Sequence, residues 1–247
     1  MLVENEPSTL PVSLLVPSRR PSSEFLDDET LAPEEMLKSL RDLERLNRGW
    51  GASRALEDFL LPRLRPQGNG SVLVIDVGAG SGSVTRSLSR RLSASGLPAR
   101  TFAVDRQWRH LAAGKLGANG TPALAADAFR LPLADGSVDW AVSTLLLHHF
   151  SPEENVRLLR ELARVARRGF AMLDVRRHLF PFLFVALAGR MTFETSVSVH
   201  DGQASVLQAY TLEEARQIAR TALPGARAEK VFPFRLLVTG SRLLTPS

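Results

Sequence analysis

Two hydrophobic periods alternate along this chain and predict a layered α/β domain. Short apolar runs predict buried strands at 72–77, 101–105, 122–126, 138–144 and 169–175. Apolar residues that recur every three or four positions predict helices between them, at 82–94, 108–116 and 152–167. Strands that alternate with helices in this way are typical of a doubly wound parallel sheet with helices on both faces.

The N-terminal part of the chain lacks this alternation. Residues 1–32 are rich in Pro, Ser, Glu and Asp and show no periodicity, so we expect a mobile tail. Helical spacing then predicts two helices within 33–66, at the start of a domain that extends over 33–247.

The C-terminal part predicts three further features. Residues 176–191 form an apolar helical segment, whereas 192–210 show no clear period and predict irregular structure. Thr211 is placed to cap a following helix. The runs 226–232 and 235–240 predict a hairpin that closes the sheet with antiparallel strands.

A glycine-rich motif follows the first predicted strand. Asp76 comes near the end of the strand, and Gly78, Gly80 and Gly82 follow at every second position. Such glycines let the backbone approach a ligand closely and leave N–H groups exposed at the start of the next helix. A turn of this kind is the usual nucleotide-cofactor site of a doubly wound sheet.

Two residues distinguish between possible cofactors at this turn. The dinucleotide fingerprint has its third glycine where Ser83 stands. The carboxylate of Asp76 repels a pyrophosphate, whereas it suits a ligand with an ammonium group and no phosphate. The motif therefore favours S-adenosylmethionine over NAD.

Two more acids follow at the ends of the next strands. Asp105 lies 23 residues after Gly82, and a carboxylate that accepts hydrogen bonds from a ribose is expected at a spacing of about 20 residues. Asp127 ends the third strand, so three acids occur in order at three successive strand ends.

These motifs, together with the Leu-Pro-Leu-Ala-Asp-Gly-Ser-Val-Asp run at 131–139, resemble class I S-adenosylmethionine-dependent methyltransferases. The resemblance is to their ubiquinone/menaquinone-biosynthesis-like small-molecule branch. It implies a Rossmann-like, seven-stranded, mostly parallel sheet with an antiparallel C-terminal strand and N-terminal helices that cover the cofactor cleft. It also implies S-adenosylmethionine as cofactor and S-adenosylhomocysteine as product. The residues it assigns to the cofactor are Asp76, Gly78, Ala79, Gly80, Gly82, Asp105, Arg106, Asp127, Ala128 and Ser143.

The same resemblance implies a substrate lid at 176–210. Its apolar stretch 179–189 is either a core helix or a lid over a greasy acceptor. We expect Arg176, Phe182 and Tyr210 to contact the acceptor.

Four residues are candidates for catalysis. His148 and His149 follow the fourth strand, and His200 and Asp201 lie in the lid segment. Histidine titrates near neutrality, and a neighbouring carboxylate can orient the ring of a general base. The alternatives are that a histidine of the first pair only packs near the cofactor, and that the second pair caps a turn.

The acceptor implied by the resemblance is a hydrophobic small molecule, aromatic, quinone or polyketide-like, of secondary metabolism. Its methylation on oxygen or ring carbon is the expected reaction. No carboxylate follows Val142 where metal-dependent catechol methyltransferases need one, so no metal is expected.

Composition narrows the remaining possibilities. The chain has no cysteine, which excludes disulfides, thiolate zinc sites and cysteine nucleophiles. Its net charge of +5 and pI near 10.5 keep an RNA methyltransferase open as an alternative. The arginines are spread along helices at spacings that suggest solvated faces, so nucleic acid is not the expected partner. A non-catalytic binding protein of the same fold is a further alternative.

We expect a cytoplasmic protein. The N-terminus carries acids rather than the basic start of a signal peptide. The apolar stretch at 179–189 is shorter than the roughly 20 residues of a membrane-spanning helix.

Overall fold

The computed structural model describes residues 15–64, 71–117 and 121–241, which build a seven-stranded sheet. The strand order is β3-β2-β1-β4-β5-β7-β6. Strands β1 to β5 pair in parallel, and β7 lies antiparallel to both β5 and β6. The predicted Rossmann-like sheet with antiparallel C-terminal strands is therefore confirmed. The strands are β1 (Val72–Val77), β2 (Ala99–Asp105), β3 (Ala123–Ala125), β4 (Val138–Thr144), β5 (Ala166–Val175), β6 (Arg227–Val231) and β7 (Arg235–Gly240).

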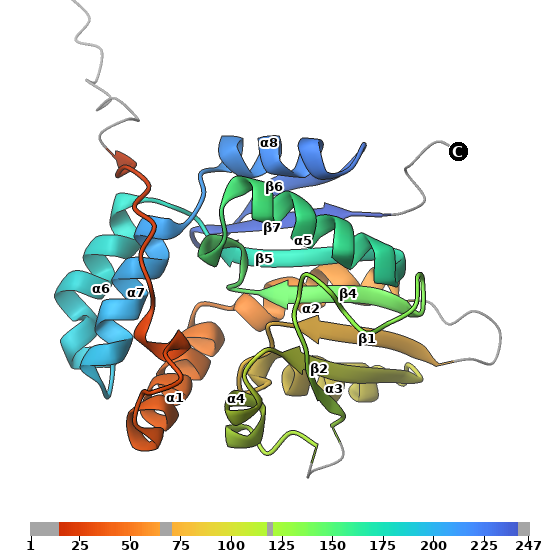
Figure 1. Cartoon of the computed structure of the whole chain (residues 1–247), viewed down its shortest axis with the longest axis horizontal. Coiled ribbons are helices and arrows are strands. Elements are labelled where there is room, and N and C mark those ends of the chain that lie inside the picture. The colour runs from red at the N-terminus through yellow and green to blue at the C-terminus, as the bar shows by residue number, and fades with distance from the viewer. Residues whose placement is uncertain (1–14, 65–70, 118–120, 242–247) are drawn as a thin grey trace, which may run out of the picture.

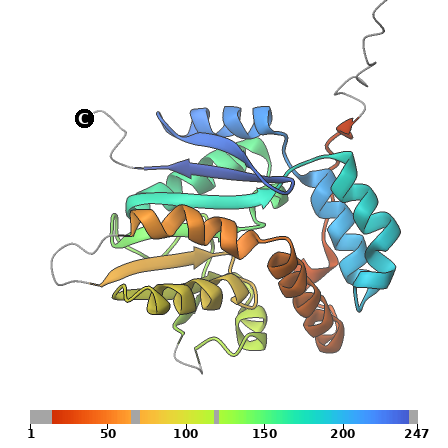
Figure 2. The same cartoon turned by 180° about the vertical axis from the view of Figure 1, so that it is seen from behind.

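Helices cover both faces of the sheet and also gather beyond one of its ends (Figures 1 and 2). In Figure 1, α5 and α8 lie over the front face, and Figure 2 shows α2 and α3 on the opposite face. Helices α1, α6 and α7 stand beyond the carboxyl ends of the parallel strands. The helices are α1 (Pro33–Gly49), α2 (Ala52–Leu60), α3 (Ser83–Ala94), α4 (Trp108–Ala113), α5 (Pro152–Val165), α6 (Leu179–Thr192), α7 (Ser196–Gln208) and α8 (Leu212–Ala222).

The sheet separates two hydrophobic cores. Leu158, Leu162 and Ile218 bring α5 and α8 into the core on one face. Leu56, Leu60 and Leu88 bring α2 and α3 into the core on the other. Helix α2 is thus a core element, although the sequence places it in an N-terminal cap over 33–66; positions 65 and 66 lie outside the described residues.

Local signals position two helices accurately. The Ser151 hydroxyl accepts from the backbone N–H of Glu154, and the Glu154 carboxylate accepts from the N–H of Ser151, which forms a capping box at the start of α5. Thr211 and Glu214 form the same box at α8, so the predicted cap is confirmed.

Helix α7 replaces the irregular structure expected over 192–210. Its sequence is rich in valine and serine and contains Gly202, all of which have weak helix propensity. Thr195 caps the helix by accepting from the N–H of Val197. Gly202 permits close packing on α6, because a Cβ there would lie 3.1 Å from a methyl of Val185. Tertiary contacts with α6 and α1 therefore override the weak local preference.

Residues 15–32, which we call the N-terminal strap, are held against the domain, although the sequence predicts a mobile tail over 1–32. Residues 1–14 of that tail lie outside the described residues. The N–H of Arg20 donates to Leu207 O at the end of α7, and at the other end of the strap Arg109 of α4 donates to Glu29 O. The strap therefore links α7 with α4 through these bonds, and Figure 1 shows it as the red ribbon that passes α7 and leads into α1.

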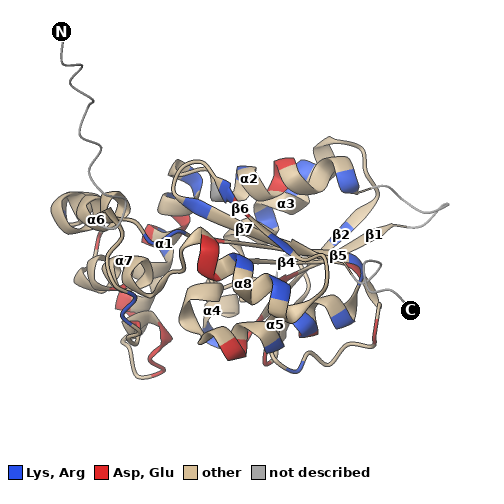
Figure 3. Cartoon of the chain, turned by 90° about the horizontal axis from the view of Figure 1, so that it is seen from above, with Lys and Arg blue, Asp and Glu red and all other residues tan. Residues whose placement is uncertain are grey.

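Basic and acidic residues are interspersed over the helices (Figure 3). On α5, Arg157 pairs with Glu154 and Arg164 with Glu161. These pairs match the spacing-based expectation of solvated, mutually neutralised helix faces. Among the described helices, none has the length and apolarity to cross a membrane.

Candidate functional site

The glycine-rich loop between β1 and α3 forms an open backbone cradle. Gly78, Gly80 and Gly82 all have positive φ, at 73°, 55° and 71°, a region that disfavours residues with a side chain. A Cβ at Gly80 would meet no atom within 4 Å, so this part of the loop faces open space. The loop thus has room for a ligand against its backbone.

The three acids at the strand ends lie around this loop and differ in burial and in hydrogen bonding. Asp105 accepts from the N–H of Gly80 at 2.8 Å and from the N–H of Gln107 at 2.8 Å, which ties the loop to the end of β2. Asp127 is exposed, and one of its oxygens accepts from the N–H of Phe129. Asp76 is buried under the loop.

Asp76 has one free oxygen. Its Oδ2 accepts from the Thr85 hydroxyl at 2.6 Å, whereas Oδ1 has no hydrogen-bond partner among the described residues. Burial raises the pKa of Asp76 to about 7. An unpaired buried carboxylate oxygen fits a ligand that brings an ammonium group, as the methionine part of S-adenosylmethionine does. The donor set of this cradle therefore suits that cofactor.

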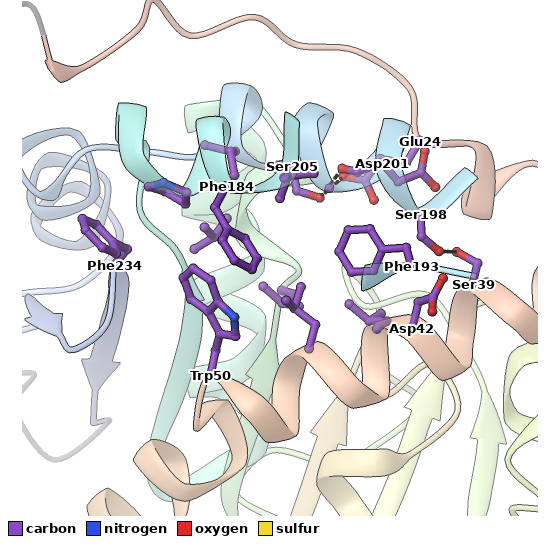
Figure 4. Close-up of a pocket in the computed structure, with 18 of the residues that line it drawn as sticks. Glu24, Ser39, Asp42, Trp50, Phe184, Phe193, Ser198, Asp201, Ser205 and Phe234 are labelled. Atoms are coloured by element: carbon purple, nitrogen blue, oxygen red, sulfur yellow. Dashed lines mark hydrogen bonds between the residues drawn. The ribbon is translucent and has the colours of Figure 1, made fainter. Parts of the chain in front are cut away.

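A cavity that is partly open to solvent lies beyond the ends of β4 and β5. Leu145 and Val175 line it at the sheet end, and α1, α6, α7 and the strap supply the other walls. Its aromatic lining consists of Trp50, Phe184, Phe193 and Phe234, which Figure 4 shows around the pocket. We call this cavity the acceptor pocket.

The acceptor pocket also contains acids, but each is held by the chain itself. Asp42 accepts from the N–H of Glu194 at 2.9 Å and pairs with Arg45. Asp201 accepts from the N–H groups of Phe25 and Leu26, at 2.9 Å each. These bonds fasten the strap to α7 and the start of α7 to α1.

His148 lies beside the pocket in a buried ion-pair network. Its Nδ1 lies 2.7 Å from Asp174 Oδ1, and its Nε2 lies 3.2 Å from Glu24 Oε1. Burial alone lowers the pKa of His148, but the two carboxylates raise it to about 10. The ring is therefore an imidazolium at neutral pH and is not a general base there.

Glu24, His148 and His149 each offer a ligand atom, and these atoms lie within 4.8 Å of one another. That spacing is compatible with a metal ion. However, metal binding needs a neutral imidazole, and the two carboxylates around His148 favour its protonated form. We therefore interpret the group as ion pairs that hold the strap.

His200 and Asp201 are neighbours on α7 with different surroundings. Asp201 lines the acceptor pocket, whereas His200 is exposed, lies outside the lining and stacks on Phe25 with ring centroids 4.1 Å apart. Asp201 Oδ1 lies 2.9 Å from His200 Nδ1. The carboxylate thus contacts the ring as predicted, but both residues also contact the strap, and the ring lies outside the pocket lining.

The predicted acceptor contacts also lie outside the pocket lining. Tyr210 is buried, and its hydroxyl donates to Phe150 O at 2.6 Å, so it is a core residue. Arg176 lies over the ring of Phe234, and Phe182 is only partly buried. Phe184, two residues further along α6, is the phenylalanine of this helix that reaches the pocket. Within the expected lid segment, α6 therefore faces the pocket with Phe184 and not with Phe182.

Of the remaining cofactor candidates, Ala79 belongs to the loop and donates its N–H to Val104 O, and Ser143 is buried at the end of β4 with no partner for its hydroxyl among the described residues. Arg106 and Ala128 directly follow the acids at 105 and 127.

Comparison with known proteins agrees with this geometry. Residues 75–173 match the family model described as a methyltransferase domain. No curated protein sequence matches the chain.

Solved structures with the same architecture include several methyltransferases. A S-adenosylmethionine-dependent methyltransferase from Aquifex aeolicus aligns with a TM-score of 0.54 and 21% identity, over 85% of this chain and 98% of the other. Magnesium protoporphyrin IX methyltransferase from Synechocystis, with bound S-adenosylhomocysteine, gives 0.52 and 17%, over 77% and 82%. Human N-acetylserotonin methyltransferase, in complex with S-adenosylmethionine, gives 0.59 and 14%, over 84% and 56%.

At these identities the structural likeness concerns the fold. The chain thus carries a methyltransferase-domain match over residues 75–173 and the fold that these S-adenosylmethionine-dependent methyltransferases share.

Proposed function

We propose that this protein transfers a methyl group from S-adenosylmethionine to oxygen or carbon of a hydrophobic, aromatic small molecule. The acceptor pocket carries this proposal. It is lined by aromatic side chains, and it lies at the carboxyl ends of β4 and β5, where open α/β sheets bind their ligands.

The cradle at β1 has a role for each of its acids in this proposal. Asp76 accepts from the ammonium group, Asp105 from the ribose hydroxyls and Asp127 from the adenine amino group. The backbone at Gly78 and Gly80 approaches the ligand, because positive φ keeps this turn open. Ala79, Gly82, Arg106, Ala128 and Ser143 complete the predicted surroundings.

The bound cofactor supplies an electrophilic methyl group, and the protein's task is to align the acceptor and exclude water. The strap serves to exclude water from the acceptor pocket, which it lines with Glu24 and Leu26 while it is bonded to Asp201 of α7 and to Gln107 before α4. The charged state of His148 means that proton removal does not depend on this ring. An acceptor whose oxygen is already ionised needs no strong base.

Calorimetry with S-adenosylhomocysteine tests the proposal most directly. A folded sample should release or absorb heat with one-to-one stoichiometry, and Asp105→Ala should weaken binding by roughly 1–3 kcal/mol because ribose hydroxyls lose their acceptor. Absence of binding by the folded wild-type protein would refute the proposed function.

Turnover is then tested with radiolabelled S-adenosylmethionine and a panel of hydroxylated naphthalenes and quinones. Transfer of label to at least one aromatic compound is expected. Transfer to transfer-RNA or ribosomal RNA instead, with steep salt dependence of RNA binding, would support the RNA alternative.

A further inference from the structure

Arg235 is a buried cation that lines the acceptor pocket, and two of its nitrogens have no hydrogen-bond partner among the described residues. The residue begins β7, pairs across the sheet with Val175, and lines the pocket together with it. Its exposed fraction is 5%, and neither Nε nor Nη1 has a hydrogen-bond partner among the described residues. Burying a guanidinium without hydrogen-bond partners costs free energy unless a ligand accepts its hydrogen bonds.

The other ionisable groups that line the pocket are bonded to residues other than Arg235. Asp42 is bonded to Glu194 N and Arg45, and Asp201 is bonded to the strap backbone. Glu24 is bonded to His148, Ser205 and Gln208. The hydroxyls of Ser39 and Ser198 bond to each other.

Asp174 is the carboxylate whose charge acts on Arg235, but its own bonds go elsewhere. It accepts from Nδ1 of His148 and from the N–H groups of His148 and Val175. Burial lowers the pKa of Arg235 to about 10 in spite of this attraction. The guanidinium is therefore charged at neutral pH, and in this pocket-lining residue two buried nitrogens have no hydrogen-bond partner among the described residues.

We propose that Arg235 binds an anionic oxygen of the acceptor, so that the substrate class is an aromatic molecule that carries a phenolate, enolate or carboxylate. This inference rests on the proposed function and narrows it. A guanidinium donates hydrogen bonds to such an oxygen in a fixed geometry, and the aromatic lining encloses the attached ring. If the bound oxygen is the methylated one, Arg235 favours its ionised form, and the proton is lost to solvent before transfer.

Three probes of matched shape test the charge preference: naphthoate, naphthalenemethanol and naphthylmethylammonium, all substituted at the same ring position. Binding is measured by calorimetry in the presence of saturating S-adenosylhomocysteine. We expect wild-type protein to bind naphthoate at least about tenfold more tightly than the neutral alcohol, as a charge-assisted hydrogen bond predicts. The ammonium compound should bind most weakly.

Arg235→Met should remove the preference for naphthoate and leave the affinity for the alcohol nearly unchanged. Arg235→Lys should keep part of the preference, because the charge remains. The matched control is Arg176→Met, which removes a neighbouring guanidinium from outside the pocket lining and should keep the wild-type preference.

Naphthoate binding no tighter than the alcohol, or no detectable naphthoate binding at millimolar concentration, would overturn the inference, as would an unchanged preference in Arg235→Met. If that variant does not fold, the order of the three probe affinities in the wild-type protein still tests the inference. Binding of S-adenosylhomocysteine is measured separately, so failure of the proposed function is distinguished from failure of the role of Arg235.

Discussion

Asp174 Oδ1 lies 2.7 Å from Nδ1 of His148, deep between β5 and the loop after β4. The opposite nitrogen of the same ring faces Glu24 of the N-terminal strap at 3.2 Å. One imidazolium thus links the strap to the sheet; Asp174 is buried, and the Glu24 side chain is only 9% exposed. The two histidines that the sequence suggests as candidate bases therefore bind the strap through its carboxylates.

The first prediction concerns stability at alkaline pH. Because the pKa of His148 is raised to about 10 in the folded protein and lies near 6.5 in an unfolded chain, its ion pairs stabilise fully below about pH 6.5. This contribution is lost as the pH rises toward 10. Glu24 and Asp174 have lowered pKa values, so their contribution is lost only in acid. Urea denaturation should show unfolding free energy falling between neutral and alkaline pH.

His148→Gln should be less stable than wild type near neutrality, and the difference should narrow as the pH approaches 10. His178→Gln is the control, because His178 caps the start of α6 outside this network and its pKa is lowered by burial. Parallel stability curves for wild type and His148→Gln would contradict the assignment.

The second prediction concerns the closure of the strap. Glu24→Gln removes the negative charge that faces both histidines, and a hydrogen bond to a charged group contributes roughly 1–3 kcal/mol. Trypsin should then cleave the Arg19–Arg20 bond roughly tenfold faster, because the strap opens more often; the bond after Arg20 precedes Pro21 and resists trypsin. Glu29→Gln changes the same charge at an exposed side chain of the strap and should leave the rate unchanged. Equal cleavage of both variants would show that Glu24 does not secure the strap.

A third prediction follows from the unpaired oxygen of Asp76. Burial raises its pKa to about 7 in the free protein, and a bound ammonium favours the ionised carboxylate and lowers that pKa. Affinity for S-adenosylhomocysteine should therefore fall as the pH drops below about 7, and binding near pH 6.5 should release a proton. Calorimetry in buffers of different ionisation enthalpy measures this release.

Asp76→Asn should abolish the proton release and flatten the pH dependence. Asp58→Asn, at an exposed position on α2, should retain both. Release that persists in Asp76→Asn would assign the proton to another group.

The sequence located the cradle better than the acceptor pocket, for a physical reason. Asp76, Asp105 and Asp127 each follow an apolar run, and parallel strands bring their ends together without further information. The pocket instead joins Asp42, Asp201 and Arg235 from three separate segments, which no local period relates.

The ordered strap and the burial of Arg235 were not predicted from the sequence, for two different reasons. The strap has the composition of a disordered segment, but Glu24 finds its partner 124 positions away at His148. The signal for Arg235 is present in the sequence, since a charged residue opens the apolar strand run at 235–240. Its burial became apparent only when β7 paired with β5.

A final prediction separates the two faces of α6. Phe184 lines the acceptor pocket and packs edge-on against Trp50 with ring centroids 5.0 Å apart, whereas Phe182 lies outside the lining. Phe184→Ala should weaken binding of naphthoate roughly tenfold, because an aromatic contact in a pocket contributes about 1–3 kcal/mol. Phe182→Ala, with the same change in volume on the same helix, should leave probe affinity near the wild-type value. Thermal unfolding of both variants reports any general loss of stability. If the two substitutions weaken probe binding equally, the acceptor does not occupy this pocket, and α6 acts only as a packed helix.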